Sequence, residues 1–228
     1  MTGMSNFKGL KYRLLRNLPG KHGTRYARQY LAYDAVRQFH VAVKETSGLT
    51  SIDLGANLGK YTALMAEHAS EVFAFEPDPW TASALRSNLS GFANVTIVEA
   101  AAAASDGRAL LYRHAEFEAN PSLFSELSSL VADKQNVAQT NPVEVRQIDF
   151  IRFLRELDRD VGVLKIDIEG AEVDLLERLL TETDLLGRVR HIFAETHETR
   201  IPHHGDRVVA LREAAANISN PKINLFWK

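Results

Sequence analysis

Two consecutive segments decide the fold, Leu49-Thr-Ser-Ile-Asp-Leu-Gly-Ala-Asn-Leu-Gly-Lys-Tyr61 and Glu71-Val-Phe-Ala-Phe-Glu-Pro77. In the first segment, an apolar strand ends in Asp53 and Gly55, and a helical pattern begins after Gly59. In the second, another apolar strand ends in Glu76, which lies 21 residues after Gly55. This order of strand, glycine turn, helix, strand and acid is typical of a nucleoside that lies across the ends of two parallel strands.

The residue types in these segments favour one class of nucleoside. Gly55 allows the chain to turn tightly beside a ligand. Asp53 can accept a hydrogen bond from a ligand hydroxyl or attract an amino group, and Glu76 can accept both ribose hydroxyls. A dinucleotide-binding turn needs glycines where this chain has Asn57 and Lys60, so a diphosphate would meet side chains there. The pattern therefore predicts a cationic or zwitterionic nucleoside such as S-adenosylmethionine; the structural alternative is a plain turn glycine with two incidental acids.

Strand and helix patterns alternate after residue 47, which predicts an α/β fold with a parallel sheet covered on both faces. The predicted strands cover 50–54, 71–76, 95–99, 107–113, 143–149, 161–166, 190–195 and 222–227. The predicted helices cover 58–68, 80–89, 150–157, 170–180 and 206–216. We divide the chain into an N-terminal helical segment, 1–47, and one nucleoside-binding domain, 48–228. A polar loop insertion near 114–142 is a candidate substrate lid, with disorder or plain decoration as alternatives.

A second group of charged residues lies in Val163-Leu-Lys-Ile-Asp-Ile-Glu-Gly-Ala-Glu172. Lys165, Asp167 and Glu169 alternate at the end of an apolar strand, so an extended chain places them on one face. Such charges are costly when buried unless they pair or bind a ligand. The segment therefore predicts a binding or catalytic site, with a structural ion pair and a helix cap as the alternative.

A third group follows the next strand, in Ala194-Glu-Thr-His-Glu198, where Glu195 and His197 share a face. With Asp167 they are expected to form a cluster of carboxylates and an imidazole. His197 can then be a general base that removes an acceptor proton. Alternatively, Asp167, Glu195 and His197 can hold a divalent metal. The sequence does not decide between these uses, and we favour acid–base or acceptor-positioning chemistry without a metal.

With these motifs in place, the chain resembles the FkbM family of S-adenosylmethionine-dependent methyltransferases, within the class I methyltransferase superfamily. The matching pieces are 52–59, 74–77, 164–172 and 195–197. The resemblance implies a three-layer Rossmann-like fold with a seven-stranded, mostly parallel sheet and an antiparallel last strand. It also implies methyl transfer, usually to oxygen, with acceptors that include polyketide and sugar hydroxyls.

The resemblance also implies roles for individual residues. Asp53, Gly55 and Asn57 would line the methionine end of S-adenosylmethionine, Glu76 would bind its ribose, and Asp167 would lie at the methyl-transfer centre. The predicted catalytic residues are Asp167, His197, Lys165 and Glu195. The predicted cofactor contacts are Asp53, Gly55, Asn57, Gly59, Tyr61, Glu76, Pro77, Ala101 and Asp167; the small side chain at 101 would leave room for adenine.

Composition limits the class of protein. A chain of 228 residues fits one α/β domain. The absence of cysteine excludes disulfides and thiolate metal sites, and a net charge of −2 provides no overall basic field for nucleic acid. No apolar run reaches the ~20 residues of a membrane span, and no signal-peptide pattern opens the chain. We expect a cytoplasmic monomer or homodimer with a small-molecule or glycan acceptor.

The N-terminal segment is basic, and its charge has two interpretations. Lys8, Lys11, Arg13 and Arg16 are followed by further cations up to Arg28. They can bind an anionic acceptor, a membrane surface or a partner. Alternatively they form the solvated face of an ordinary helix, because Leu10, Leu14, Leu15 and Leu18 supply an apolar stripe for packing.

Two other functions are considered for the whole chain. The first is an NAD-dependent oxidoreductase, against which Asn57 and Lys60 argue. The second is a non-catalytic nucleoside-binding module of the same fold. The four charged catalytic candidates argue against it, since a site without chemistry need not keep costly buried charges.

Overall fold

The structure is a computed structural model that describes residues 2–131, 137–138, 142–201 and 203–227. Residues 132–136 and 139–141 of the predicted loop insertion therefore lie outside the described residues. The helices are α1 (Thr2–Leu15), α2 (Gly20–Glu45), α3 (Lys60–Ala66), α4 (Pro79–Asn88), α5 (Pro121–Phe124), α6 (Phe150–Leu157), α7 (Glu172–Leu179), α8 (Thr183–Leu186) and α9 (His204–Ala216), with a 3₁₀ turn at Ser125–Leu127. The strands are β1 (Thr50–Leu54), β2 (Glu71–Phe75), β3 (Val95–Val98), β4 (Ala101–Ala103), β5 (Gly107–Leu111), β6 (Val143–Asp149), β7 (Val161–Ile166), β8 (Val189–Ala194) and β9 (Lys222–Asn224).

The strands form two sheets in the described part of the chain. The main sheet has the order β3-β2-β1-β7-β8-β9, and every neighbouring pair in it is parallel. The smaller sheet, β4-β6-β5, contains an antiparallel pair, β5 and β6. The predicted α/β class and mostly parallel sheet are confirmed.

Two details of the predicted sheet are wrong. Among the residues that the structure describes, the main sheet has six strands rather than seven, and the last strand, β9, is parallel to β8 rather than antiparallel. The reason is the connection between them. The chain leaves β8 and returns through α9, and a helical crossover brings the next strand back in the same direction, whereas an antiparallel strand follows a hairpin.

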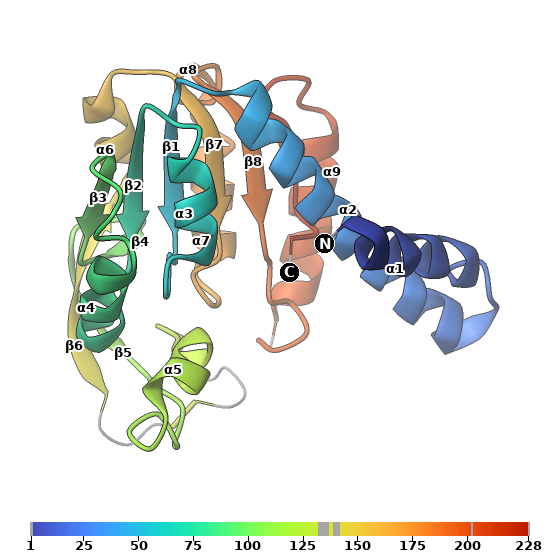
Figure 1. The fold of residues 1–228 in the computed structure, drawn as a ribbon, viewed down its shortest axis with the longest axis horizontal. Coiled ribbons are helices and arrows are strands. Elements are labelled where there is room, and N and C mark those ends of the chain that lie inside the picture. The colour runs from blue at the N-terminus through green and yellow to red at the C-terminus, as the bar shows by residue number, and fades with distance from the viewer. Residues whose placement is uncertain (1, 132–136, 139–141, 202, 228) are drawn as a thin grey trace.

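Helices cover both faces of the main sheet, so the body has three layers (Figure 1). On one face, α2 and α3 pack around Phe39 against Val163 of β7. On the other face, α6, α7, α8 and α9 pack against Leu164 and Ile166 of the same strand. Successive residues of a strand point to opposite faces, so Lys165 goes to the same face as Val163. This alternation places a charged side chain inside an apolar layer.

The N-terminal helices differ from the rest because only part of them joins the core. The second half of α2 contributes Ala35, Phe39, Ala42 and Val43 to a core cluster. The first half of α2 and the whole of α1 form a helical hairpin that projects from the body (Figure 1). Over the stretches that the structure describes, no helix combines the length and the apolar character needed to span a bilayer.

Candidate active site

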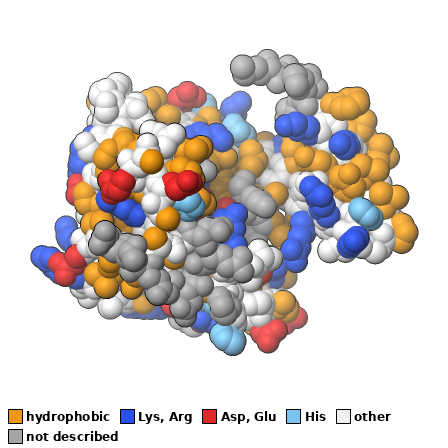
Figure 2. Space-filling view, turned by 90° about the horizontal axis from the view of Figure 1, so that it is seen from below, with side chains coloured by type: hydrophobic (Ala, Val, Ile, Leu, Met, Phe, Trp, Pro, Cys, Tyr) orange, Lys and Arg blue, Asp and Glu red, His pale blue; other side chains and the backbone are white. Residues whose placement is uncertain are grey.

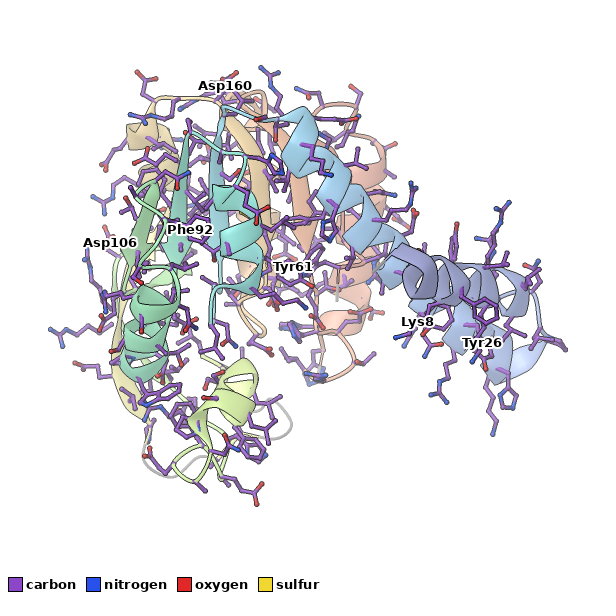
Figure 3. The ribbon with its side chains drawn as sticks, in the orientation of Figure 1. Lys8, Tyr26, Tyr61, Phe92, Asp106 and Asp160 are labelled. Atoms are coloured by element: carbon purple, nitrogen blue, oxygen red, sulfur yellow. The ribbon has the colours of Figure 1, made fainter. Side chains whose placement is uncertain are left out.

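A cavity of about 390 Å³ opens at the carboxyl ends of β1, β2, β7 and β8. Open α/β sheets bind their ligands at this end of the strands. Tyr61, at the start of α3, lies toward this end of the sheet, whereas Asp160, just before β7, lies at the opposite end (Figure 3). Among the described residues, nothing from α1 or α2 lines the cavity.

The turn after β1 is tight because the end of β7 crosses directly beside it. Gly55 has φ +79°, and the N–H of Asp167 donates to the carbonyl of Leu54 at 2.9 Å. A Cβ at position 55 would overlap the carbonyl oxygen of Asp167. The two strand ends therefore approach as closely as their backbones allow, and only glycine fits.

We expect Gly55→Ala to lower the free energy of unfolding by roughly 2–4 kcal/mol, since left-handed strain adds to a backbone overlap. Gly48→Ala is the matched control, because Gly48 has φ +85° but no heavy atom within 4 Å of its would-be Cβ. It should lose only the strain, about 1–2 kcal/mol. Urea denaturation of both variants measures the difference. Equal losses would contradict a close approach of the two strand ends.

Glu76 lies at the end of β2 with both carboxylate oxygens directed by the backbone. Its Oε2 accepts from the N–H of Asn57 at 2.9 Å, and its Oε1 accepts from the N–H of Asp78 at 3.0 Å. Burial raises the pKa of Glu76 to about 7, although both N–H groups oppose the rise. Each oxygen retains a free lone pair, so the ionised carboxylate can accept two further hydrogen bonds.

The loop insertion forms part of the cavity wall. The hydroxyl of Ser125 donates to Oδ1 of Asn57 at 2.9 Å, which ties the insertion to the turn after β1. Ser129 pairs with Tyr112 through its backbone, and its hydroxyl donates to the carbonyl of Glu169 at 2.5 Å. The wall residues from the insertion are Ser125, Leu127, Ser128 and Leu130.

Asp53 lies behind the cavity rather than in it. It is a register neighbour of Lys165, and its Oδ1 lies 3.0 Å from the Lys165 ammonium. Its Oδ2 accepts from the hydroxyl of Thr62 at 2.7 Å, and the residue has no exposed surface. Asp53, predicted to contact the cofactor directly, does not line the cavity, and its acceptor atoms are turned to Lys165 and Thr62.

Lys165 is a buried cation at the back of the cavity. Besides Asp53, its ammonium group contacts the carbonyl of Gly55 at 3.2 Å and Oδ2 of Asp167 at 3.7 Å. Burial alone lowers the pKa of Lys165, but the attraction of Asp53 and Asp167 outweighs it, so the pKa is raised. Lys165 therefore stays charged and cannot act as a base.

Asp167 and Glu195 are the cavity carboxylates that directly follow β7 and β8. Asp167 Oδ1 is buried and has no hydrogen-bond partner in the described structure. Burial raises the pKa of Asp167, with Lys165 opposing the rise and Glu169 adding to it. Burial and the charge of Asp167 together raise the pKa of Glu195 to about 7. A group with this pKa exchanges a proton readily near neutral pH.

His197 lies between two glutamates. Its Nδ1 is 3.1 Å from Oε1 of Glu172, and its Nε2 is 3.1 Å from Oε2 of Glu169. Burial lowers the pKa of His197, but these two hydrogen bonds reverse the effect and raise it to about 11. An imidazole that bonds a carboxylate at both nitrogens is the protonated form. The geometry therefore gives His197 the role of a cation rather than that of a base.

The same geometry bears on the metal alternative. Asp167, Glu169 and His197 offer ligand atoms within 4.8 Å of one another. This candidate set contains Glu169 in place of Glu195, which was the predicted third ligand. A metal binds to a lone pair on an imidazole nitrogen. An imidazolium that donates a hydrogen bond from each nitrogen has no free lone pair. The arrangement favours proton transfer at this site.

Glu172 is the central residue that the sequence patterns missed. It is fully buried at the start of α7, and its carboxylate accepts from the N–H groups of Ile168 and Gly170, each at 2.8 Å. The turn before it is left-handed at Glu169 (φ +57°) and Gly170 (φ +118°), which leaves these N–H groups inside the fold. The available signal was an acid in the first turn of a predicted helix, where carboxylates bind free N–H groups.

Most of the predicted site residues meet at the cavity. Those that line it are Gly55, Asn57, Tyr61, Glu76, Pro77, Ala101, Lys165, Asp167, Glu195 and His197. Gly59 does not; it has φ +90°, and a Cβ there would press on Leu85 of α4 and on Leu89, which follows that helix. Arg200 and Trp227 are among the lining residues that were not predicted. The Trp227 ring lies 4.7 Å from that of Tyr61, a packing partner from the far end of the chain.

Comparison with known proteins identifies the family of the chain. A model of the methyltransferase FkbM domain matches residues 53–216, which run from the end of β1 to the end of α9 and include every predicted catalytic residue. A curated protein named Methyltransferase 1, from Beauveria bassiana (strain ARSEF 2860), is 32% identical over 155 residues, 60% of this chain and 61% of that protein. The chain thus spans about three fifths of the length of this relative.

Two solved structures are similar in part. The methyltransferase FkbM from Methylobacillus flagellatus KT is 14% identical, with a TM-score of 0.40 over 76% of this chain and 45% of that one. An rRNA methylase from Streptococcus thermophilus is 20% identical, with a TM-score of 0.28 over 29% of this chain and 39% of that one. At these values, neither likeness bears on the substrate.

Proposed function

Because the chain belongs to the FkbM methyltransferase family, we propose that it transfers a methyl group from S-adenosylmethionine to a hydroxyl oxygen. The acceptor is a small molecule, a sugar or a polyketide-type compound. One observation carries this proposal. One cavity at the carboxyl ends of β1, β2, β7 and β8 has a ribose-type acceptor, Glu76, and two further carboxyl groups whose pKa is raised, Asp167 and Glu195.

The charge of the site suits a cationic donor. Five carboxyl groups share two cations around the end of β7. The acids are Asp53, Asp167, Glu169, Glu172 and Glu195, and the cations are Lys165 and His197. When bound, S-adenosylmethionine supplies a methyl group activated by a sulfonium charge. The carboxylates of Asp167 and Glu195, which line the cavity, would stabilise that charge, with the buried Oδ1 of Asp167 free to accept from the ligand.

In the proposed mechanism the methyl group passes directly to the acceptor, and no protein side chain forms a covalent bond with it. Glu76 and Asp167 would hold S-adenosylmethionine, whose methyl carbon would pass to the acceptor oxygen while the electrons of the carbon–sulfur bond stay on sulfur. Glu195 takes the proton that the acceptor hydroxyl loses. Asp167 orients the reactants, and the enclosing wall, with Ser125 and Leu130, excludes water. Lys165 and His197 hold the carboxylates in place and do not exchange protons.

Glu76, the proposed ribose-binding residue, provides a test of whether the cavity binds S-adenosylmethionine. S-Adenosylhomocysteine is expected to bind, and its affinity should rise by up to about tenfold between about pH 6 and pH 8. The reason is that Glu76, with a pKa of about 7, accepts hydroxyl hydrogen bonds better when ionised. Isothermal titration at several pH values measures this. Glu76→Gln should bind more weakly, by roughly tenfold, and lose the pH dependence.

The same titration separates the competing functions. NADH should show no saturable binding, and NADH binding without S-adenosylhomocysteine binding would overturn the proposal in favour of an oxidoreductase. Cofactor binding that persists with no turnover on any hydroxyl acceptor would support a non-catalytic module. Asp34→Gln is a suitable control, since Asp34 lies on α2, bonds only Arg37 and Gln38 among the described residues, and does not line the cavity.

A further inference from the structure

The N-terminal hairpin carries a charge opposite to that of the remaining chain. Its seven cations are Lys8, Lys11, Arg13, Arg16, Lys21, Arg25 and Arg28, and residues 1–33 contain no Asp or Glu. The remaining sequence has 20 Lys and Arg against 29 Asp and Glu, a net charge of −9. All seven cations are exposed, and none forms an ion pair within the described parts of the chain. The hairpin is therefore a concentrated, unneutralised basic surface.

The hairpin also exposes an apolar stripe, contrary to the interpretation of these leucines as an ordinary packing face. The exposed fractions are 74% for Phe7, 55% for Leu10, 66% for Leu14 and 45% for Leu18. Their spacing of three to four residues aligns them along one side of α1 and its C-terminal end. Figure 2 shows apolar and basic side chains interleaved on the hairpin surface.

The stripe is exposed because another face of α1 already packs on α2. Gly9 is buried, and a Cβ there would overlap the ring of Tyr33. The rings of Tyr12 and Tyr26 lie 6.3 Å apart across the same contact. Tyr26, on α2, and Lys8, on α1, both lie on the projecting hairpin (Figure 3). The hairpin is thus an ordered unit whose outer apolar side has no partner in the described structure.

We propose that this hairpin docks on an anionic lipid bilayer, with Phe7, Leu10, Leu14 and Leu18 entering the interface and the surrounding Lys and Arg side chains contacting lipid phosphates. A bilayer surface satisfies both features, since apolar side chains enter the acyl boundary while long basic side chains extend to the headgroups. The negative surface potential of such a membrane attracts clustered Lys and Arg, and the acidic body is repelled, which sets the orientation.

The observations favour lipid over other anionic partners. A nucleic acid would engage the cations, but four large exposed apolar side chains contribute nothing to phosphate contacts. A second copy of the chain would offer an acidic body to the cations. Its other exposed large apolar side chains, however, come from several separate elements, with Trp80 on α4, Leu110 on β5 and Val209 on α9. Only lipid matches charge and apolar stripe together.

The test uses the full chain with vesicles of phosphatidylcholine mixed with phosphatidylglycerol, and with phosphatidylcholine alone. Sedimentation should depend on phosphatidylglycerol and weaken with added salt. The triple variant Phe7→Ser, Leu10→Ser and Leu14→Ser should bind about tenfold or more weakly. The control variant Leu110→Ser and Val209→Ser, which removes exposed apolar side chains from the body, should bind like the original protein.

Three results would overturn the inference: no dependence on phosphatidylglycerol, undiminished vesicle binding by the triple variant, or a dimer in light scattering that the triple variant abolishes. The last would identify a second copy as the partner. The outcome is separate from the methyltransferase proposal, because the stripe lies away from the cavity and the triple variant should bind S-adenosylhomocysteine normally. Unchanged circular dichroism would confirm that the variant remains folded.

Discussion

Replacing Glu195 with glutamine is expected to lower turnover by about 10²- to 10⁴-fold, the usual contribution of a general base, while the affinity for S-adenosylhomocysteine stays within about threefold. Glutamine keeps the shape of the side chain but has no basic oxygen. Glu195 is the expected base because it lines the cavity and has a pKa of about 7, whereas Lys165 and His197 are held as cations. Single-turnover rates with saturating donor measure the loss.

The dependence of rate on pH distinguishes the candidate bases. A base must be deprotonated to act, so the rate should rise with pH and level off near pH 7 if Glu195 is the base. It should continue to rise toward about pH 11 if His197 is the base. The limb near pH 7 should vanish in Glu195→Gln. A bound donor cation favours the ionised carboxylate, so the observed midpoint should lie at or below 7.

Glu198→Gln is the matched control for this variant. Glu198 lies three residues further along and pairs with Arg212 at 2.9 Å, outside the cavity lining, so its turnover should be unchanged. Equal losses in the two variants would indicate a general effect of removing a local charge. A rate abolished by EDTA and restored by Mn²⁺ would instead support a metal held by Asp167, Glu169 and His197.

Replacing Glu172 with alanine is expected to lower the free energy of unfolding by about 3–5 kcal/mol, because it removes one partner of a buried ion pair. The change leaves the His197 cation without one of its glutamates and the N–H groups of Ile168 and Gly170 without an acceptor. For a chain of this size the melting temperature should fall by roughly 6–20 °C. Thermal unfolding followed by circular dichroism measures it.

Two further variants keep this result interpretable. Asp174→Ala, on the same helix but 69% exposed and paired with Arg207, should cost less than about 1 kcal/mol. Glu172→Gln retains an acceptor oxygen but not the charge, so it should lie between the two and serve if the alanine variant does not fold. A loss in Glu172→Ala no greater than in Asp174→Ala would contradict a structural role for the buried glutamate.

The stability difference should also depend on pH. The pKa of His197 is raised from 6.5 to about 11 in the folded chain, so its contribution is complete below about pH 6.5 and is lost as the pH rises toward 11. The gap between the wild-type protein and Glu172→Ala should therefore be larger at about pH 7 than at about pH 10. A gap that widens with pH would show that His197 is neutral in the folded state.

Local patterns were enough to predict the elements that carry the site. The strands at 50–54 and 161–166 have the predicted bounds, because runs of apolar residues ending in an acid and a glycine occur only where a buried strand gives way to a turn. The helix predicted at 150–157 is also confirmed as α6. Asp149 caps it by accepting a hydrogen bond from the N–H of Arg152. The last strand was wrong because its direction depends on the crossover through α9.

For the candidate site, local patterns predict the positions of the residues but not their protonation. The order of motifs was enough to predict which residues gather at the carboxyl ends of the strands, because a parallel sheet brings Gly55, Glu76, Asp167 and Glu195 to the same edge. It could not assign their protonation. That depends on which groups face each other across strands, such as Asp53 beside Lys165 in register, 112 positions apart in the chain.

The tertiary structure was needed to show that Glu169 and Glu172 hold His197 between them as a cation, and that Glu195 is a cavity carboxyl group with a pKa of about 7. Only it showed that the apolar stripe of α1 is exposed while another face of that helix packs on α2. The physical reason is common to both. The type and spacing of residues set local structure, whereas burial and charge pairing arise from neighbours that are distant in sequence and differ from site to site.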